Sequence, residues 1–319
     1  MSNFWTKLKK PIFVIAPMAN VTDVAFRAMF AKYGKPDVMW TEFVSADGLC
    51  SPGRKVLLRD LAFSDAERPI VAQLFSGHPD KMYEAAKLVQ ELGFDGIDIN
   101  MGCPDKAVEK QGAGAGHIKD PENAIKVIQA AKRGAPNIPI SVKTRIGYNK
   151  VEIDTWLPSI LKEGVAALTV HLRTRKEMSD VDAHWDIMPK IVEIRNSIAP
   201  DTILLGNGDV TSIADGIQKV KQSGCDGAMV GRGIFGNPWF FSGKVLSDIE
   251  PKERLRVMLE HAREFDKQLG DIKSFAIMKK HFKAYVSGWD QAKELRVKLM
   301  ECDDLGAVEK VVEEYLQEK

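Results

Sequence analysis

The chain has 319 residues, of which 45% are hydrophobic and 28% charged, and its formal net charge is +1. This composition is typical of a globular protein, and no run approaches the roughly 18 apolar residues of a membrane helix, so we expect no membrane partner. The near-neutral charge excludes a generally basic nucleic-acid coat but leaves local basic patches open. Residues 1–10 lack the apolar core of a secretory signal, so we expect a cytoplasmic protein. Separately, we expect a monomer.

Short apolar runs separated by turn signals recur along most of the chain. They show little alternation of apolar and polar residues, which is typical of parallel strands buried on both faces. The eight expected strands are residues 12–16, 38–43, 70–75, 96–100, 138–143, 167–171, 203–206 and 227–230. Helical patterns lie between them, at 80–92, 121–131, 154–163, 188–198 and 212–222. Eight such units in roughly 240 residues predict an α/β fold, the TIM (β/α)8 barrel, with a doubly wound sheet as the alternative.

The end of the chain has a different pattern. From about residue 250 the strand signals stop, and amphipathic helical patterns continue with few glycines or prolines. We therefore expect two domains, a barrel at 1–245 and an all-helical domain at 246–319.

Polar residues gather at the C-terminal ends of the expected strands, where a TIM barrel places its reactive residues. They are residues 17–18, Glu42, Gln73, 100–103, 143–145, 171–173, 207–209 and 231–232. Such residues converge on one mouth of a barrel, so we expect a shared ligand site. The alternative is a set of independent turn and capping residues.

The last two units carry a cofactor signal. Segments 207–209 and 231–233 follow strands seven and eight, where this fold often binds phosphate through backbone N–H groups. Glycine allows close backbone approach, and Arg232 can neutralise a phosphate. Similar glycine-rich turns also close loops that bind no ligand.

Two strand ends suit a flavin ring. Lys143 and His171 can place a cation and a hydrogen-bond donor beside its electron-accepting edge, and Gln73 can hydrogen-bond the same ring. A histidine satisfied within the barrel is the alternative for His171.

Cys103 lies just past a strand end, in Asn100-Met101-Gly102-Cys103-Pro104. A thiol with an ordinary pKa near about 8.5 is mostly protonated at neutral pH and can act as a general acid. A nucleophile or an inert thiol is the alternative. The glycine-rich run at 112–116 is either a mobile lid or a set of turn glycines. The four cysteines show no zinc or disulfide spacing, and we predict no metal.

These motifs together resemble the tRNA-dihydrouridine synthase family. The matching segments are Ala16-Pro17-Met18-Ala19-Asn20-Val21-Thr22-Asp23 with Phe26-Arg27, Asn100-Met101-Gly102-Cys103-Pro104, Val142-Lys143-Thr144-Arg145-Ile146-Gly147, His171-Leu172-Arg173-Thr174-Arg175, Gly206-Asn207-Gly208-Asp209 and Met229-Val230-Gly231-Arg232-Gly233. They cover most of the chain in order.

The resemblance implies an FMN-bearing barrel and a helical RNA-binding domain, which together reduce uridine to 5,6-dihydrouridine in tRNA with electrons from NADPH. Ribosomal RNA is the other RNA substrate to consider. By the same resemblance FMN would be held by Ala16, Pro17, Met18, Gln73, Lys143, His171, Asn207, Gly208, Asp209, Gly231 and Arg232. Asn100 and Arg145 would hold the uracil, and Cys103 would donate the proton.

A stacked base cannot reach a barrel mouth, so the uridine must be flipped and held by contacts to the RNA backbone. We expect these contacts from the basic segment 273–298, through Lys279, Lys280 and Arg296. The aromatic residues interleaved with them are Phe275, Phe282, Tyr285 and Trp289. A solvated helix face with the aromatic residues in the core is the alternative.

Three positions depart from the family pattern, namely His117, Leu172 and Ser179. Two other functions remain open. One is a flavin enzyme that acts on a free pyrimidine, such as a dihydroorotate dehydrogenase. The other is a non-catalytic RNA-binding protein that keeps the barrel as a scaffold.

Overall fold

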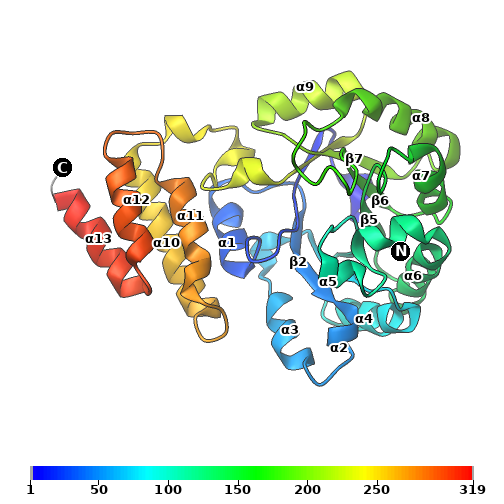
Figure 1. The fold of residues 1–319 in the computed structure, drawn as a ribbon, viewed down its shortest axis with the longest axis horizontal. Coiled ribbons are helices and arrows are strands. Elements are labelled where there is room, and N and C mark those ends of the chain that lie inside the picture. Colours follow the sequence, from blue (N-terminus) through cyan, green and yellow to red (C-terminus); the bar gives the residue numbers. More distant parts are fainter. Residues whose placement is uncertain (1–2, 318–319) are drawn as a thin grey trace.

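The computed structural model describes residues 3–317, which form a barrel of parallel strands followed by a bundle of helices (Figure 1). The outermost residues of the two predicted domains, 1–2 and 318–319, lie outside the described residues. The strands are β1 (Ile12–Ile15), β2 (Met39–Ser45), β3 (Ile70–Phe75), β4 (Gly96–Met101), β5 (Ile140–Arg145), β6 (Ala167–His171), β7 (Ile203–Asn207) and β8 (Gly227–Val230). Each strand end lies within two residues of its expected position.

The strands form one sheet in the order β1-β8-β7-β6-β5-β4-β3-β2. All neighbouring pairs are parallel, and β1 and β2 meet at a parallel bridge between Val14 and Val38. The sheet therefore closes on itself, and the predicted barrel is confirmed over the doubly wound alternative.

Helices surround this barrel, and five of the nine named here match the helical patterns expected from the sequence. They are α1 (Val24–Tyr33), α2 (Ala46–Leu49), α3 (Arg54–Asp60), α4 (Pro79–Glu91), α5 (Lys106–Glu109), α6 (Pro121–Gly134), α7 (Ile153–Leu161), α8 (Met188–Ile198) and α9 (Ile213–Ser223). The Asp120 side chain accepts a hydrogen bond from the Asn123 N–H at the start of α6, and Gly224, with φ of 74°, ends α9. None of the helices in residues 3–317 is long and apolar enough to cross a membrane.

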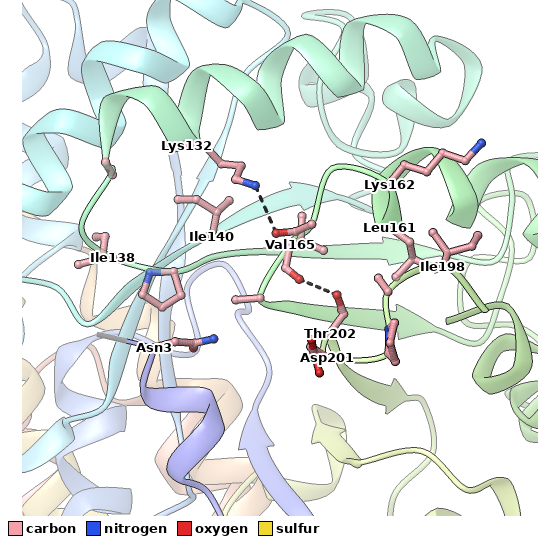
Figure 2. Close-up of a pocket in the computed structure, with 16 residues that line it drawn as sticks. Asn3, Lys132, Ile138, Ile140, Leu161, Lys162, Val165, Ile198, Asp201 and Thr202 are labelled. Atoms are coloured by element: carbon pink, nitrogen blue, oxygen red, sulfur yellow. Dashed lines mark hydrogen bonds between the residues drawn. The ribbon is translucent and has the colours of Figure 1, made fainter. Parts of the chain in front are cut away.

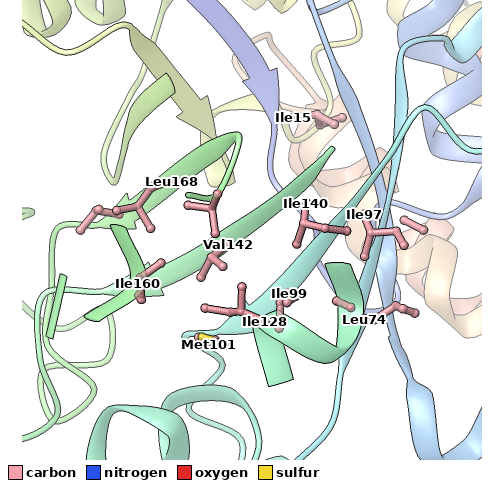
Figure 3. Packing of buried hydrophobic residues seen from close by; sticks show 14 of the residues in the cluster. Ile15, Leu74, Ile97, Ile99, Met101, Ile128, Ile140, Val142, Ile160 and Leu168 are labelled. Carbon is pink, nitrogen blue, oxygen red and sulfur yellow. The ribbon is translucent and has the colours of Figure 1, made fainter. Parts of the chain in front are cut away.

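Alternation along the strands separates two cores. In β4, Ile97 and Ile99 pack with Ile128 of α6 in the layer between sheet and helices (Figure 3). The residues between them, Asp98 and Asn100, face the barrel interior because successive side chains of a strand point to opposite faces. The interior is therefore the place where polar side chains of neighbouring strands meet.

The lower half of the barrel interior, at the N-terminal ends of the strands, is apolar. Val14, Trp40 and Leu205 pack there with Trp5 of the short 3-10 helix η1 (Phe4–Lys7), which lies before β1. This packing fills the N-terminal end of the barrel, so a ligand site must lie at the other end.

The last four helices form a bundle beside the barrel (Figure 1). They are α10 (Pro251–Leu269), α11 (Met278–Tyr285), α12 (Ala292–Glu301) and α13 (Leu305–Gln317). No strand follows β8 within the described residues. Phe282 and Tyr285 are buried in the bundle core, and Phe275 packs against Phe265 and Phe282. Of the two interpretations of these aromatic residues, the core is the one that the structure shows.

The bundle is joined to the barrel through α1, which packs against α10. Glu260 of α10 accepts hydrogen bonds from the Tyr33 hydroxyl, at 2.6 Å, and from Lys32. Lys273 lies between Glu42 of β2, at 2.6 Å, and Asp60 of α3, at 2.8 Å. The helical domain is therefore bonded to residues that surround the barrel mouth.

A fully buried ion pair fixes α1 to the barrel. The Arg27 Nε donates to Glu67 at 2.6 Å, and its two Nη groups donate to the carbonyls of Thr22 and Ala62. Glu67 also accepts a hydrogen bond from the Ser64 N–H at 2.7 Å. Every charged group here is satisfied, so removal of one partner leaves the other charge buried and unpaired.

Arg27→Leu is expected to lower the free energy of unfolding by about 3–5 kcal/mol, because the Glu67 carboxylate then stays buried without its partner. Urea denaturation followed by circular dichroism measures this. The double variant Arg27→Leu with Glu67→Leu removes both charges and should lose less than the single variant. A single variant as stable as the parent would contradict this assignment.

Candidate functional site

A cavity of about 610 Å³ opens at the C-terminal ends of β1, β5, β6, β7 and β8. Its size is within the usual range for small-molecule sites. Ten of the eleven residues predicted to hold a cofactor line it, and Gln73 is the exception. Their roles as cofactor ligands stay predictions. Lining residues outside that prediction are Arg173, Ser179, Val210, Thr211 and Gly233.

One wall of the cavity is the turn at 231–233, which leads into a 3-10 helix. Within the described residues, no group accepts a hydrogen bond from the backbone N–H groups of this turn. The Arg232 side chain is 64% exposed and donates to Asp209 at 2.8 Å. Free N–H groups beside an arginine form a site for an anionic group such as a phosphate.

Asp209 holds two arginines at the cavity, because it accepts hydrogen bonds from both Arg173 and Arg232. Burial acts to raise the pKa of Asp209, but the Ala183 N–H and the Arg173 guanidinium outweigh it and keep the pKa below its ordinary value. Gly208, before it, has φ of 131°, and a Cβ there would lie 2.6 Å from the Cβ of Ala183. This turn therefore requires glycine.

Arg173 was expected at the barrel mouth as one of the strand-end residues 171–173, but it was given no part in holding the cofactor. It is buried, and besides Asp209 it contacts the Nε2 atom of His171 at 3.3 Å. Its position two residues after His171 was a signal, since side chains two apart along an extended chain share a face.

Basic side chains gather where β5 and β6 end at the cavity. Burial and the neighbouring Arg145 lower the pKa of Lys143 to about 8, and no described residue forms an ion pair with it. Burial and then Lys143 lower the pKa of His171 well below its ordinary value, so the imidazole is neutral. Because Arg173 can only donate, Nε2 of His171 is the acceptor and its proton is on Nδ1.

Cys103 lies in a tightly bonded turn after β4. The Asn100 Oδ1 accepts hydrogen bonds from the N–H groups of Gly102, at 3.1 Å, and Cys103, at 2.9 Å. The thiol is partly buried, and burial raises its pKa above the ordinary value. It is therefore protonated at neutral pH, as a general acid must be.

The glycine-rich run packs against this turn. The Ala115 N–H donates to the Cys103 carbonyl at 2.9 Å, and a Cβ at Gly114 would lie 2.7 Å from that oxygen. Gly114 has φ of 58°, and the residues from Gly114 to Ile118 are buried. Of the two interpretations, the glycines serve turn geometry and close packing here rather than an open lid.

The predicted uracil contacts are hydrogen-bonded within the protein. Arg145 donates through Nε to the Gly102 carbonyl at 2.8 Å, and through Nη1 to the carbonyls of Thr174 and Met178. Burial lowers the pKa of Arg145 to about 10, so it stays cationic at neutral pH. The Asn100 Nδ2 donates to Gln73, at 3.1 Å.

The predicted RNA contacts lie on α11 and α12, and each has a partner inside the protein. Lys279 forms an ion pair with Asp303 at 3.0 Å. Lys280 donates to the Asn20 carbonyl at 2.7 Å, and Arg296 to the Val286 carbonyl at 2.8 Å. These partners reduce what the three cations can offer to RNA.

The three departures from the family pattern lie in different surroundings. Leu172 is fully buried, and His117 is buried with its Nε2 atom 3.1 Å from the Ser76 carbonyl. Ser179 is exposed and lines the cavity. Of the three, Ser179 alone belongs to the site.

A second cavity, of about 630 Å³, lies at the other end of the barrel, where β5, β6 and β7 begin (Figure 2). Its polar groups bond the backbone: Lys132 donates to the Glu163 carbonyl and Thr202 to the Val165 carbonyl, both at 2.7 Å. This end of a TIM barrel serves stability, so the first cavity is the candidate site.

Comparison with solved structures concerns the fold. Morphinone reductase superposes with a TM-score of 0.54 at 10% identity, covering 74% of this chain and 87% of its own. Histamine dehydrogenase from Rhizobium sp. superposes with a TM-score of 0.51 at 12% identity, covering 79% of this chain and 48% of its own. The predicted TIM-barrel fold is confirmed.

Comparison of sequences identifies the family. The chain matches the family described as Dihydrouridine synthase (Dus) over residues 14–319. It is 42% identical to a probable tRNA-dihydrouridine synthase 2 of Bacillus subtilis, covering 98% of this chain and 96% of the relative. It is 40% identical to a probable tRNA-dihydrouridine synthase of Staphylococcus aureus, covering 98% and 95%. The chain therefore belongs to the dihydrouridine synthase family.

Proposed function

We propose that this protein reduces uridine in tRNA to 5,6-dihydrouridine, with FMN as cofactor and NADPH as electron donor. The observation that carries the proposal is the cavity at the barrel mouth, with the free cation of Lys143 on its wall and the Cys103 turn on the adjacent strand. The names of the relatives support tRNA as the substrate. Mapping of dihydrouridine in tRNA and ribosomal RNA, with and without the protein, tests the substrate.

The residues of the cavity fit FMN. The free N–H groups at 231–233 and the Arg232 guanidinium suit its phosphate. Lys143 and the Nδ1–H of His171 suit the polar edge of its ring. When reduced and bound there, the cofactor supplies a hydride to one carbon of the uracil double bond.

Cys103 supplies the other hydrogen. Its thiol proton passes to the neighbouring ring carbon, which completes the saturation of the double bond and leaves a thiolate. Lys143 and Arg145 interact favourably with that thiolate, since both act to lower the pKa of Cys103. The two cations therefore stabilise the charge that the proton transfer creates.

The two other functions make different predictions for the same purified protein. A free-pyrimidine enzyme turns over orotate or uracil and leaves RNA unchanged. A non-catalytic RNA-binding protein stays colourless after incubation with FMN. Either result would reject the proposal.

The barrel mouth offers further cations to RNA. Lys106, Lys110, Lys119, Lys150 and Lys176 are exposed and form no ion pair within the described part of the chain. Such free lysines can neutralise phosphates at little cost, whereas Lys279, Lys280 and Arg296 first have to leave their internal partners.

Three of these lysines gather around Tyr148. Lys119 lies 4.5 Å from the centre of its ring, and Lys119 and Lys150 line one shallow cavity with it. The backbone N–H of Lys176 donates to the Tyr148 carbonyl at 2.9 Å, which places this residue beside Tyr148. Arg175 links this group to the Cys103 turn through the Pro104 carbonyl. We place the RNA backbone next to the flipped uridine on this surface.

Cys103→Ala is expected to keep bound flavin and NADPH oxidation but to lose dihydrouridine formation by about 10²–10⁴-fold, because the general acid is absent. Flavin absorbance and nucleoside analysis of the tRNA measure the two effects. Cys50→Ala, at an exposed thiol away from the cavity, is the control. Normal product formation by Cys103→Ala would refute its role as proton donor.

The rate of dihydrouridine formation is expected to fall as the pH rises through about 8, because Lys143 then loses the charge that favours the anionic reduced ring. The Cys103 thiol ionises at higher pH, since burial raises its pKa. Lys143→Arg should move the decline to higher pH, which a pH–rate profile measures. An unmoved decline would assign it to another group.

Lys119→Glu with Lys150→Glu is expected to weaken tRNA binding by about tenfold or more and to reduce the salt slope by about 2. Filter binding over a salt series measures both. Lys87→Glu with Lys126→Glu, on exposed faces of α4 and α6, is the control with the same charge change. Equal losses in both double variants would show that net charge, not this surface, controls binding.

A further inference from the structure

We propose that Asp98, inside the barrel, is a positioning residue that acts through Gln73 and Asn100 to hold Cys103 in place. The inference rests on the proposed function only in taking Cys103 as the proton donor. Asp98 itself lies below the strand ends and does not line the cavity.

The first link is a row of polar side chains across three strands. Gln73 of β3 is in register with Asp98 of β4, which is in register with Ser141 of β5. The Asp98 carboxylate accepts from the Gln73 Nε2 at 2.7 Å and from the Ser141 hydroxyl at 2.6 Å. All three side chains are buried, and Asp98 is 0% exposed.

The second link runs from this row to the thiol. The Gln73 Oε1 accepts from the Asn100 Nδ2 at 3.1 Å. The Asn100 Oδ1 accepts from the N–H groups of Gly102 and Cys103. A continuous chain of hydrogen bonds therefore connects the Asp98 carboxylate to the backbone of Cys103.

The direction of this chain is forced by chemistry. Backbone N–H groups only donate, so Asn100 must turn its oxygen to Cys103 and its NH₂ to Gln73. Gln73 must then turn its oxygen to Asn100 and its own NH₂ to Asp98. The last member must accept from Gln73, and an ionised carboxylate accepts there whichever way it turns. Asp98 thus sets the orientation of both amides.

A purely structural role explains Asp98 less well. Burial raises the pKa of Asp98 to about 6, so the folded protein holds an ion that its surroundings disfavour. A neutral side chain of the same size would fill the barrel interior at lower cost. The neutral substitution is therefore expected to leave the protein as stable as before, or more stable, above that pKa.

Asp98→Ala removes the acceptor at the end of the chain. The Gln73 NH₂ then has no partner on β4, so the orientation of Gln73 and, through it, of Asn100 is no longer fixed. We expect kcat for dihydrouridine to fall by about 10²-fold in a protein whose circular dichroism spectrum matches that of the parent.

Alkylation of Cys103 by iodoacetamide, located by peptide mass spectrometry, gives a measure that does not depend on RNA. In Asp98→Ala the released turn should expose the thiol, so that Cys103 reacts about fivefold faster or more at a given pH. Asp37→Ala is the control: Asp37 lies just before β2, at the other end of the barrel, and its carboxylate accepts the backbone N–H of Phe13. That variant should alkylate and turn over at the parent's rate.

The conservative variant tests the direction of the chain. Asp98→Asn keeps an acceptor, because its amide oxygen faces Gln73 while its NH₂ donates to the Ser141 hydroxyl, which in turn donates to the Ile97 carbonyl. Its alkylation rate and kcat should stay within about threefold of those of the parent.

The outcomes separate the two proposals. A folded Asp98→Ala protein with the parent's alkylation rate, or an Asp98→Asn protein that alkylates as fast as Asp98→Ala, would overturn the role of Asp98. A parent protein that forms no dihydrouridine in any RNA would overturn the proposed function, while alkylation would still decide the role of Asp98.

Discussion

Closure of the parallel sheet is the constraint on which the site depends. The ladder between β1 and β8, from Ile12 with Gly227 to Ile15 with Val230, joins the first strand to the last. It continues past the strand ends, where the Ala16 N–H donates to the Val230 carbonyl at 2.8 Å. Residues more than two hundred positions apart in the chain therefore form one wall of the cavity. Without closure Gly231 would not lie against Ala16 and Met18.

The barrel interior is divided by polarity, and the division explains the electrostatics of the mouth. Apolar side chains and Trp5 fill the lower half, so the charged side chains of β5 and β6 are held near the upper rim. Lys143 and Arg145 lie on the same strand face, and Arg145 together with burial lowers the pKa of Lys143. A cavity with this much unpaired positive charge favours an anionic ligand. Asp209 reduces the charge only locally, by holding Arg173 and Arg232.

The helical bundle belongs to the site through its first contacts with the barrel. Lys273 is bound to Glu42, and Glu42 in turn accepts the Asn20 N–H in the loop after β1. Lys280 donates to the Asn20 carbonyl of the same loop. Ala16, Pro17 and Met18 line the cavity just before it. These basic residues of the bundle thus support the barrel mouth, whereas the lysines around Tyr148 form no ion pair within the described residues and are free for a nucleic acid.

The sequence alone determined the strands, five of the helices between them and the residues at the strand ends, because buried parallel strands and helix signals are local patterns. It could not determine the partners of the side chains. In the sequence nothing distinguished Lys280 and Arg296 from unpaired cations. Only the packing of the bundle brings them to their carbonyl acceptors. Asp98 was not predicted as a site residue, because it lies inside β4, two residues before Asn100, and not at the strand end. Its link to Gln73 depends on strand register, which the closed tertiary structure alone decides.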